Sequence, residues 1–434
     1  MGDKYVVFVD DQEVNGAIGL AAGTASFGIG GGPRSRAEEL GLRRSLLDNL
    51  VPALTGAAAG DPAAVTSAMG SFALGVKDGT IDPAQAPPHR DGVQLLEGVN
   101  AIVIDEELAD LDSLKSIHGI IVFENVELYI PEPVAEGPAV AAALASDWHL
   151  KKIGLQSPSS GGQGVLIGIL DTGIDASHPE FAGKTIYFKE FDWFGNEVPG
   201  PARDAQDHGT HVSSIAAGAR AGVAPGADLA VAAVLTKKGP KGMSGSLVQI
   251  VNGFNWLVAT AFGDNDVGVD VVNASLGGAG FHPYLWPSVQ SARQLGVLLL
   301  AAIGNSGGKG VGRHGSPGNY PEAVSVGATD DSDTVAGFSD WGIVAPPAGP
   351  KYPVPELCAP GVDVYAAVPG GGYALKSGTS MATPVVTGVA ARRISANPAL
   401  RKNPQALYVS LRSQLAPYGA HHLGNQGGAG RIIA

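Results

Sequence analysis

Three short segments place an aspartate, a histidine and a serine along the chain in that order. They read Leu-Asp-Thr-Gly around Asp171, Asp-His-Gly-Thr-His around His208 and Gly-Thr-Ser-Met-Ala around Ser380. A serine hydroxyl is a weak nucleophile until an imidazole takes its proton. The imidazole in turn needs a carboxylate that fixes its tautomer and stabilises its charged form. Together the three residue types predict nucleophilic attack on an acyl group.

The predicted local structure would present each of these side chains. Residues 165–170 are an apolar run typical of a strand buried on both faces, and Asp171 follows at its carboxyl end, where open α/β sheets bind ligands. His208 begins a predicted helix. Ser380 lies at the start of another, and we expect Pro384 in the first turn, where a missing N–H costs little. The N–H groups of that helix start would stabilise an oxyanion.

A fourth segment adds a hydrogen-bond donor. Residues 296–303 form another apolar strand, which Gly304 and Asn305 follow. A side-chain amide at a strand end can donate to a developing oxyanion. Taken singly, Asp171 and Ser380 fit turn or helix-cap residues equally well. Four such segments in one chain, each at a predicted strand end or helix start, favour a single catalytic site.

Two other kinds of chemistry are less well supported. His208 and His211 are three residues apart and could suggest a metal site, but the sequence holds no third ligand in a fitting motif and no Cys cluster. We therefore assign no metal ligands and interpret His211 as a packed, supporting histidine. Cys358 is the single cysteine, so it forms no intrachain disulfide, and we expect a buried structural thiol.

Composition restricts the possible partners. The 434 residues are 44% hydrophobic and 16% charged, as in a folded globular protein. A formal net charge of −13 argues against nucleic acid and anionic membranes as partners. We find no signal peptide in the acidic start of the chain and no apolar run long enough to span a membrane. A cytoplasmic location is therefore expected, or secretion if a leader has been trimmed.

A proline-rich segment divides the chain into residues 1–133 and 134–434. The first part mixes strand and helix signals, including a capping box from Ser35 to Glu38 that opens an apolar-faced helix. It is expected to contain strands at 4–9, 101–104 and 120–130, a short helix at 108–114 and irregular chain over 52–93.

The second part alternates apolar strands with amphipathic helices, which predicts an α/β domain with a parallel sheet. The expected strands and helices cover residues 164–170, 208–218, 229–235, 247–261, 270–275, 286–294 and 297–302.

The four catalytic segments closely resemble the subtilisin-like serine proteases, over roughly residues 146–434. The resemblance implies a three-layer α/β domain with a central, mostly parallel sheet. It also implies a serine endopeptidase that hydrolyses extended polypeptides through an acyl-enzyme. Asp171 would orient the imidazole, His208 would act as base and then acid, and Ser380 would attack the scissile carbonyl. Asn305 and the Ser380 backbone N–H would bind the oxyanion.

Substrate contacts follow from the same resemblance. Ser244 and Gly245 match the edge strand that pairs with an extended peptide. Ser275, Leu276, Gly277 and Gly278 match the opposite wall of the cleft, and Gly304 matches part of the primary pocket. The implied partners are protein or peptide substrates. No cofactor is required, and structural calcium stays open because the family's calcium-binding insertion in the His helix is missing.

Residues 1–130 resemble the family's inhibitory propeptide, a small α+β domain of the ferredoxin-like β-α-β-β-α-β type. The matching parts are the first strand at Lys4 and a final strand near residues 126–130. The resemblance implies a precursor whose prodomain assists folding, blocks the cleft with its tail and is removed by the enzyme itself. The alternative is an unrelated accessory domain.

Two rival functions remain. One is a catalytically idle binding protein that keeps the subtilisin fold, and labelling of Ser380 by an organophosphonate or sulfonyl fluoride distinguishes it from an enzyme. The other is a lipase or esterase. The Gly-x-Ser-x-Gly motif of those enzymes is absent around Ser380, and peptide and ester substrates would discriminate between the two.

Overall fold

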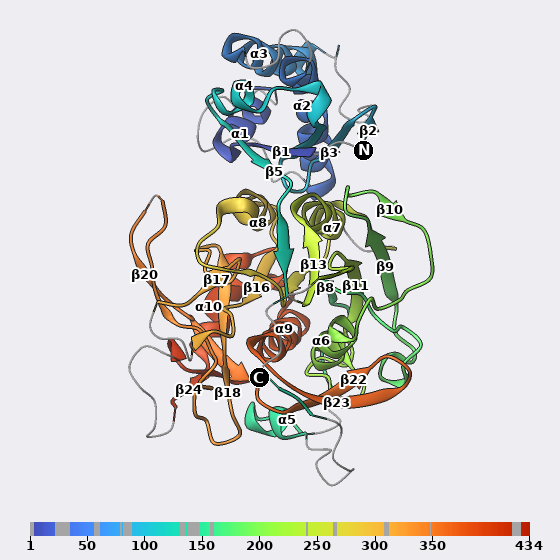
Figure 1. Ribbon diagram of the computed structural model, residues 1–434, viewed down its shortest axis with the longest axis vertical. Coiled ribbons are helices and arrows are strands. Elements are labelled where there is room, and N and C mark those ends of the chain that lie inside the picture. Colours follow the sequence, from blue (N-terminus) through green and yellow to red (C-terminus); the bar gives the residue numbers. More distant parts are fainter. Residues whose placement is uncertain are drawn as a thin grey trace.

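A computed structural model shows a small N-terminal unit seated on a larger one, above helices α7 (Leu247–Ala259) and α8 (Trp286–Gln294) (Figure 1). The residues described are 4–21, 35–55, 61–78, 80, 89–130, 135–137, 147–156, 160–239, 242–263, 267–307, 312–347, 349–418 and 427–434.

The N-terminal unit has an antiparallel sheet of order β2-β3-β4-β1-β5. The strands are β1 (Lys4–Val9), β2 (His89–Arg90), β3 (Val93–Leu96), β4 (Ala101–Asp105) and β5 (Ile120–Glu124). The helices are α1 (Asp11–Ala21), α2 (Arg36–Leu54), α3 (Pro62–Asp78) and α4 (Leu111–Lys115). The order of β3, β4, β1 and β5, with helices between β1 and β3 and between β4 and β5, is that of the expected α+β arrangement. The capping box is present, since the Ser35 side chain accepts from the backbone N–H of Glu38.

The predicted irregular chain over residues 52–93 is wrong, because α3 occupies much of it. Asp61 accepts a hydrogen bond from the N–H of Ala63, and Pro62 fits the first turn, where no intrahelical N–H bond is lost. Val65 and Phe72 are buried among the side chains of α2 and β1. Apolar side chains in this segment recur at spacings of three, four and seven residues, which indicates a helix, but its many Ala, Gly and Pro residues obscure the pattern.

The predicted strand over residues 120–130 divides into two strands in different sheets. β5 belongs to the N-terminal unit, whereas β6 (Glu127–Tyr129) pairs with β13 (Gly242–Ser246) of the larger unit. The division occurs at Asn125 and Val126, whose oxygens accept hydrogen bonds from the first N–H groups of α7. Those helix N–H groups have no partner within the helix. The hydrogen bonds that they donate to residues 125 and 126 hold this part of the chain against α7 and away from the first sheet.

The larger unit contains a ten-stranded sheet of order β10-β9-β11-β8-β14-β16-β18-β21-β25-β24, in which the two outermost pairings are antiparallel and all others parallel. The strands are β8 (Leu166–Asp171), β9 (Ile186–Phe191), β10 (Glu197–Val198), β11 (Asp228–Ala233), β14 (Val271–Ala274), β16 (Leu298–Ala302), β18 (Ala323–Thr329), β21 (Leu357–Pro360), β24 (Leu415–Ala416) and β25 (Arg431–Ile432).

Helices cover both faces of this sheet. Along β8, Leu166 and Leu170 pack with the side chains of α7 and α8, whereas Ile167 and Ile169 pack with the opposite layer. That layer consists of α6 (His208–Ala217), α9 (Thr379–Ala396) and α10 (Pro404–Ser413). The three-layer α/β fold with a mostly parallel sheet is therefore confirmed, and the helices and strands expected here lie within a few residues of their predicted bounds.

The proline-rich segment is only partly a linker. β7 (Ala135–Gly137) pairs antiparallel with β23 (Gly372–Ser377), the strand that leads to Ser380. The remaining predicted linker residues, 131–134 and 138, lie outside the described residues, so a domain boundary between residues 133 and 134 stays a prediction.

Two other sequence expectations can be compared with the structure. Cys358 is buried, which confirms a structural thiol, and burial raises its pKa to about 12. Among the described residues, no helix has both the length and the apolar character needed to cross a membrane.

One hydrophobic cluster spans the two units. Phe8 and Val103 of the N-terminal sheet lie in the same buried cluster as Phe254 of α7. The ring of Phe123 meets the ring of Tyr284 edge-on, with centroids 5.2 Å apart. A sheet face that would be exposed in an isolated N-terminal unit is thus covered by α7 and α8.

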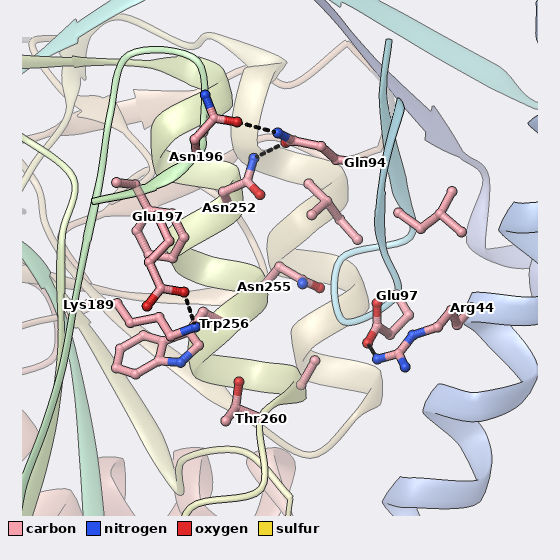
Figure 2. A pocket seen from close by; sticks show the side chains of 15 residues that line it. Arg44, Gln94, Glu97, Lys189, Asn196, Glu197, Asn252, Asn255, Trp256 and Thr260 are labelled. Atoms are coloured by element: carbon pink, nitrogen blue, oxygen red, sulfur yellow. Dashed lines mark hydrogen bonds and ion pairs between the residues drawn. The ribbon is translucent and has the colours of Figure 1, made fainter. Parts of the chain in front are cut away.

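Polar contacts surround this shared cluster. A cavity of about 460 Å³ is lined by both units. Gln94 contacts Asn196 and Asn252 at this cavity (Figure 2). Arg44 and Glu97, which also line the cavity, form an ion pair within the N-terminal unit (Figure 2).

Arg43, with only 1% of its surface exposed, makes a buried polar connection between the units. Its Nη1 donates to the hydroxyl of Ser291 on α8 at 2.7 Å and to Oδ1 of Asn100 at 3.0 Å. Its Nε contacts Glu39 at 3.1 Å. The guanidinium therefore fixes the orientation of the units through directional bonds in a site that excludes water.

We expect Arg43→Met to lower the free energy of unfolding by about 3 kcal/mol, because it leaves buried polar groups without their donor. The measurement is urea unfolding in the Ser380→Ala background, which lacks the candidate nucleophile. Lys151→Met is the control and should cost about 1 kcal/mol or less, since its ion pair with Asp147 is largely exposed and lies within one unit. Equal losses for the two variants would contradict this role of Arg43.

Candidate functional site

Three neighbouring parallel strands end at one edge of the large sheet and carry the predicted residues there. β8 ends at Asp171, Ser275 follows β14, and Gly304 and Asn305 follow β16. Helices α6 and α9 pack against each other below this sheet (Figure 1). Both begin at the same edge of the sheet, where His208 of α6 contacts Asp171 and Ser380 of α9 contacts Ser275. Parallel strands thus bring segments more than 200 residues apart in the chain into one site.

The imidazole of His208 and the carboxylate of Asp171 form a buried pair. His208 Nδ1 lies 2.7 Å from Asp171 Oδ1, and the side chains are 1% and 0% exposed. The same carboxylate oxygen accepts from the backbone N–H of Thr172 at 2.7 Å. With Nδ1 at a carboxylate, the ring carries its proton there and presents Nε2 as the basic nitrogen.

The Nε2 atom of His208 is buried and has no hydrogen-bond partner in the part of the chain that the structure describes. A buried imidazole nitrogen without a partner is costly and is expected where a site receives another group. The nitrogen opposite the carboxylate is thus available for proton transfer.

A carboxylate that the sequence analysis missed holds the start of α6. Asp204 accepts from the backbone N–H of Thr210 at 2.7 Å and from the hydroxyl of Thr172 at 2.6 Å. Asp207, the residue before the helix, makes no capping hydrogen bond and instead pairs with Lys376 at 2.8 Å. Asp204 precedes the helix by four residues without a regular capping spacing, so no local pattern indicated it.

Ser380 occupies the first turn of α9, but the expectation for Pro384 is wrong. Because α9 begins at Thr379, Pro384 lies in the second turn and removes the N–H that would bond to the Ser380 carbonyl. The hydroxyl of Ser275 replaces that donor, at 3.0 Å from the carbonyl oxygen. The side chain of Asn273 in turn donates to the Ser275 hydroxyl at 3.0 Å. A residue predicted to line the substrate cleft therefore also supports the backbone of the candidate nucleophile.

The Ser380 hydroxyl itself donates to the backbone carbonyl of Ser275 at 3.3 Å, a long contact. The side chain is almost fully buried. Its hydroxyl therefore has a weak local partner, which a rotation about the Cα–Cβ bond would break.

Asn305 is oriented by the residue next to the serine. Its Oδ1 accepts from both the backbone N–H and the hydroxyl of Thr379, each at 2.9 Å. Two donors on the oxygen place the amide nitrogen on the other side of the group, where Gly378 is the neighbouring residue. The amide thus presents N–H donors beside the start of α9.

The second histidine of the motif is structural. His211 is fully buried, and its Nε2 lies 3.2 Å from the carbonyl of Ala374. Burial, and then the positive charge of Lys376, lower the pKa of His211 to about 3, so the ring is neutral near pH 7. Across the described ranges, no group of three or more His, Cys, Asp or Glu side chains is arranged to hold a metal ion.

The predicted edge strand is paired with the protein's own N-terminal unit. In β13, Ser244 lies opposite Tyr129 and Gly245 opposite Leu128 of β6. On its other side, Tyr129 accepts through its carbonyl from the N–H of Gly277 at 3.1 Å. Ile130 donates its N–H to Met243 at 3.0 Å. Residues 127–130 therefore lie extended between β13 and the segment that follows β14.

The remaining predicted cleft residues lie at the same edge. Leu276 is buried in the core below the cleft, and Gly278 is in β15 (Gly278–Ala279), which pairs with β17 (Gly315–Ser316). Gly304 has a φ of 119°, and a Cβ there would meet the Asp340 carboxylate at 2.2 Å, so only glycine fits. The structure thus places the predicted residues at one edge of the sheet, where Asp171 contacts His208, Ser275 contacts Ser380 and Asn305 contacts Thr379.

Comparison with known proteins agrees with this arrangement. A model of the subtilase family matches residues 162–417. "Subtilisin-like protease 3" of Arthroderma benhamiae is 33% identical over 259 residues, which cover 58% of this chain and 59% of that protein. "Subtilisin-like protease 1" of Arthroderma gypseum is 31% identical over 323 residues, or 70% and 58% of the two chains. The chain thus spans less than two thirds of the length of these relatives.

Solved structures show the same fold. A cold-adapted subtilisin-like serine proteinase is similar with a TM-score of 0.52 and 32% identity, covering 66% of this chain and 96% of that one. The S41 psychrophilic protease is similar with a TM-score of 0.55 and 32% identity, covering 66% and 97%. The match of the family model extends over more than half of the chain and includes all four predicted catalytic residues. The chain therefore belongs to the subtilase family.

Proposed function

We propose that the protein is a serine endopeptidase that hydrolyses peptide bonds of extended polypeptides through an acyl-enzyme. One observation carries most of the proposal: the buried Asp171–His208 pair at the sheet edge where α9 presents Ser380. An idle binding protein would not need a water-excluded carboxylate on the imidazole or a buried Nε2 without a partner. No observation favours that alternative.

Acylation begins when Ser380 turns its hydroxyl from the carbonyl of Ser275 to Nε2 of His208. His208 takes the proton while Oγ attacks the scissile carbonyl, and Asp171 stabilises the imidazolium. The negative oxygen of the tetrahedral intermediate accepts from the amide of Asn305 and from the Ser380 backbone N–H. His208 then gives its proton to the leaving amine as the C–N bond breaks.

Deacylation repeats these steps with water. His208 removes a proton from the water molecule, the resulting hydroxide attacks the acyl carbon, and the proton returns to Oγ of Ser380 as the ester bond breaks. No cofactor takes part in either half, and structural calcium is not required by any step.

We further propose that the chain is an autoinhibited precursor and that its N-terminal unit is its own inhibitor. Residues 127–130 pair with β13 and Gly277, which are the segments expected to hold a substrate. Residues 135–137 pair with β23, the strand that leads to Ser380. The described segments before residue 131 and after residue 134 are thus both paired with strands of the larger unit, which supports cleavage between Ile130 and Ala135. A prodomain cut there and still docked through Arg43 would continue to block the cleft.

A fluorophosphonate should label the processed protein at Ser380, because His208 is the general base proposed to activate this hydroxyl. Peptide mapping by mass spectrometry identifies the labelled residue. Ser380→Ala and His208→Ala should abolish labelling and cleavage of denatured casein. A wild-type protein that folds but neither reacts nor cleaves casein would support the idle binding protein.

Asn305→Ala should reduce kcat by about 10²–10³-fold with little change in KM, which is the loss seen when an oxyanion donor is removed from a serine protease of this family. The physical reason is that the amide bonds to the transition state and not to the planar carbonyl. Asn305→Asp keeps the acceptor for Thr379 but places a negative charge beside the oxyanion, so it should be at least as inactive. A change confined to KM would assign Asn305 to substrate binding instead.

Self-processing should cut the full-length wild-type chain between residues 130 and 135 and yield two fragments, whereas Ser380→Ala should remain one chain. Intact-mass spectrometry reports both the cut and its position. Mixing the Ser380→Ala chain with active enzyme tests whether cutting occurs between molecules. A wild-type chain that stays intact while cleaving casein would refute the precursor proposal and leave the peptidase proposal standing.

A further inference from the structure

The side chain of Glu127 in β6 is bound by side chains of the larger unit. The hydroxyl of Ser244 donates to Oε1 at 2.7 Å, and Nζ of Lys237 lies 3.4 Å from the same oxygen. Within β6, the hydroxyl of Tyr129 donates to Oε2 at 2.7 Å. These hydrogen bonds, that of Ser244 first, hold the pKa of Glu127 below its ordinary value, so the group is a carboxylate near pH 7.

The groups that receive this carboxylate are held in place by the larger unit itself. Ser244 is fully buried in β13. Lys237, in the adjacent strand β12 (Lys237–Gly239), places Nζ 4.1 Å from the centre of the Trp193 ring, which attracts a cation to its face. The carbonyl of Trp193 accepts from the hydroxyl of Ser246 at 2.5 Å. The cation and the hydroxyl are therefore positioned by contacts that do not involve Glu127.

Successive side chains of residues 127–130 alternate between two environments. Leu128 and Ile130 point into the larger unit and are 9% and 4% exposed. Glu127 and Tyr129 lie at the rim. A polypeptide added as a strand obtains affinity from main-chain hydrogen bonds and selectivity from the pockets for alternate side chains. Any substrate that replaces β6 would place one side chain beside Lys237 and Ser244.

We propose that Trp193, Lys237 and Ser244 form a subsite that recognises a carboxylate side chain of the substrate. This inference rests on the peptidase proposed above and names a substrate class for it. The favoured segments are extended and carry a glutamate followed, at the first and third positions after it, by aliphatic residues. Glu127 of the N-terminal unit occupies the subsite as an internal copy of such a substrate.

Quenched fluorescent peptides that copy residues 125–137, with Glu, Gln or Lys at the position of Glu127, test the subsite with the full-length protein after its own processing. We expect kcat/KM to fall roughly tenfold from Glu to Lys, mainly through KM, with Gln between them. Lys237→Met should reduce the Glu-to-Lys ratio to threefold or less. Lys238→Met is the matched control and should keep the ratio, since this exposed neighbour points to the other face of the strand. Equal kcat/KM values of the wild type for the Glu and Lys peptides would overturn the subsite.

A second measurement does not depend on catalysis. In the uncut Ser380→Ala chain, Glu127→Lys and Lys237→Glu should each speed hydrogen exchange at the amides of residues 128–130 roughly tenfold, and the double reversal should restore much of the protection. Unchanged exchange in both single variants would contradict recognition of the carboxylate. If no peptide is cleaved and Ser380 does not react, the peptidase proposal fails, while the exchange data still decide whether the carboxylate is recognised.

Discussion

The parallel pairing of β8, β14 and β16 is the constraint on which the whole site depends. At or just after the end of each strand lies a residue that must contact a helix start: Asp171 contacts His208, Ser275 contacts Ser380, and Asn305 contacts Thr379. A shift of one residue in any register would turn these side chains to the other face of the sheet. The alternating apolar residues on both faces prevent that shift, because each face is buried under its own helices. The packing of the core therefore also determines the geometry of the site.

The serine illustrates how the fold supports an otherwise unfavourable local structure. Pro384 removes a hydrogen bond from α9 one turn after the candidate nucleophile. Ser275 compensates from a neighbouring strand, and Asn273 holds Ser275. The start of the helix is thereby tied to the sheet and not only to its own next turn. Positional precision at Ser380 comes from this tertiary contact, which explains how a helix with a proline in its second turn can present a reactive group.

Much of this architecture could be predicted from residue patterns, and the exceptions have physical causes. The buried strands and amphipathic helices of the larger unit have strong periodicity, so their positions were predicted closely. Helix α3 was missed because Ala- and Gly-rich turns weaken the helical pattern, although Val65 and Phe72 keep it. The separation of β5 from β6 could not be predicted, since it depends on Asn125 and Val126 satisfying the start of α7 in the other unit. Asp204 was missed because it bonds to the start of α6 without a regular capping spacing. Lys376 was missed because its partner, Asp207, is distant in the sequence.

The account finally depends on the proximity of His208 and Ser380, which a peptide chloromethyl ketone measures directly. The serine hydroxyl adds to the ketone carbonyl of the reagent. An imidazole nitrogen within reach is then alkylated by the chloromethyl carbon, with loss of chloride. Peptide mapping of the processed protein should show alkylation at Nε2 of His208, at a rate that collapses in Ser380→Ala. Alkylation at another residue, or an unchanged rate without the serine hydroxyl, would contradict the proposed catalytic site.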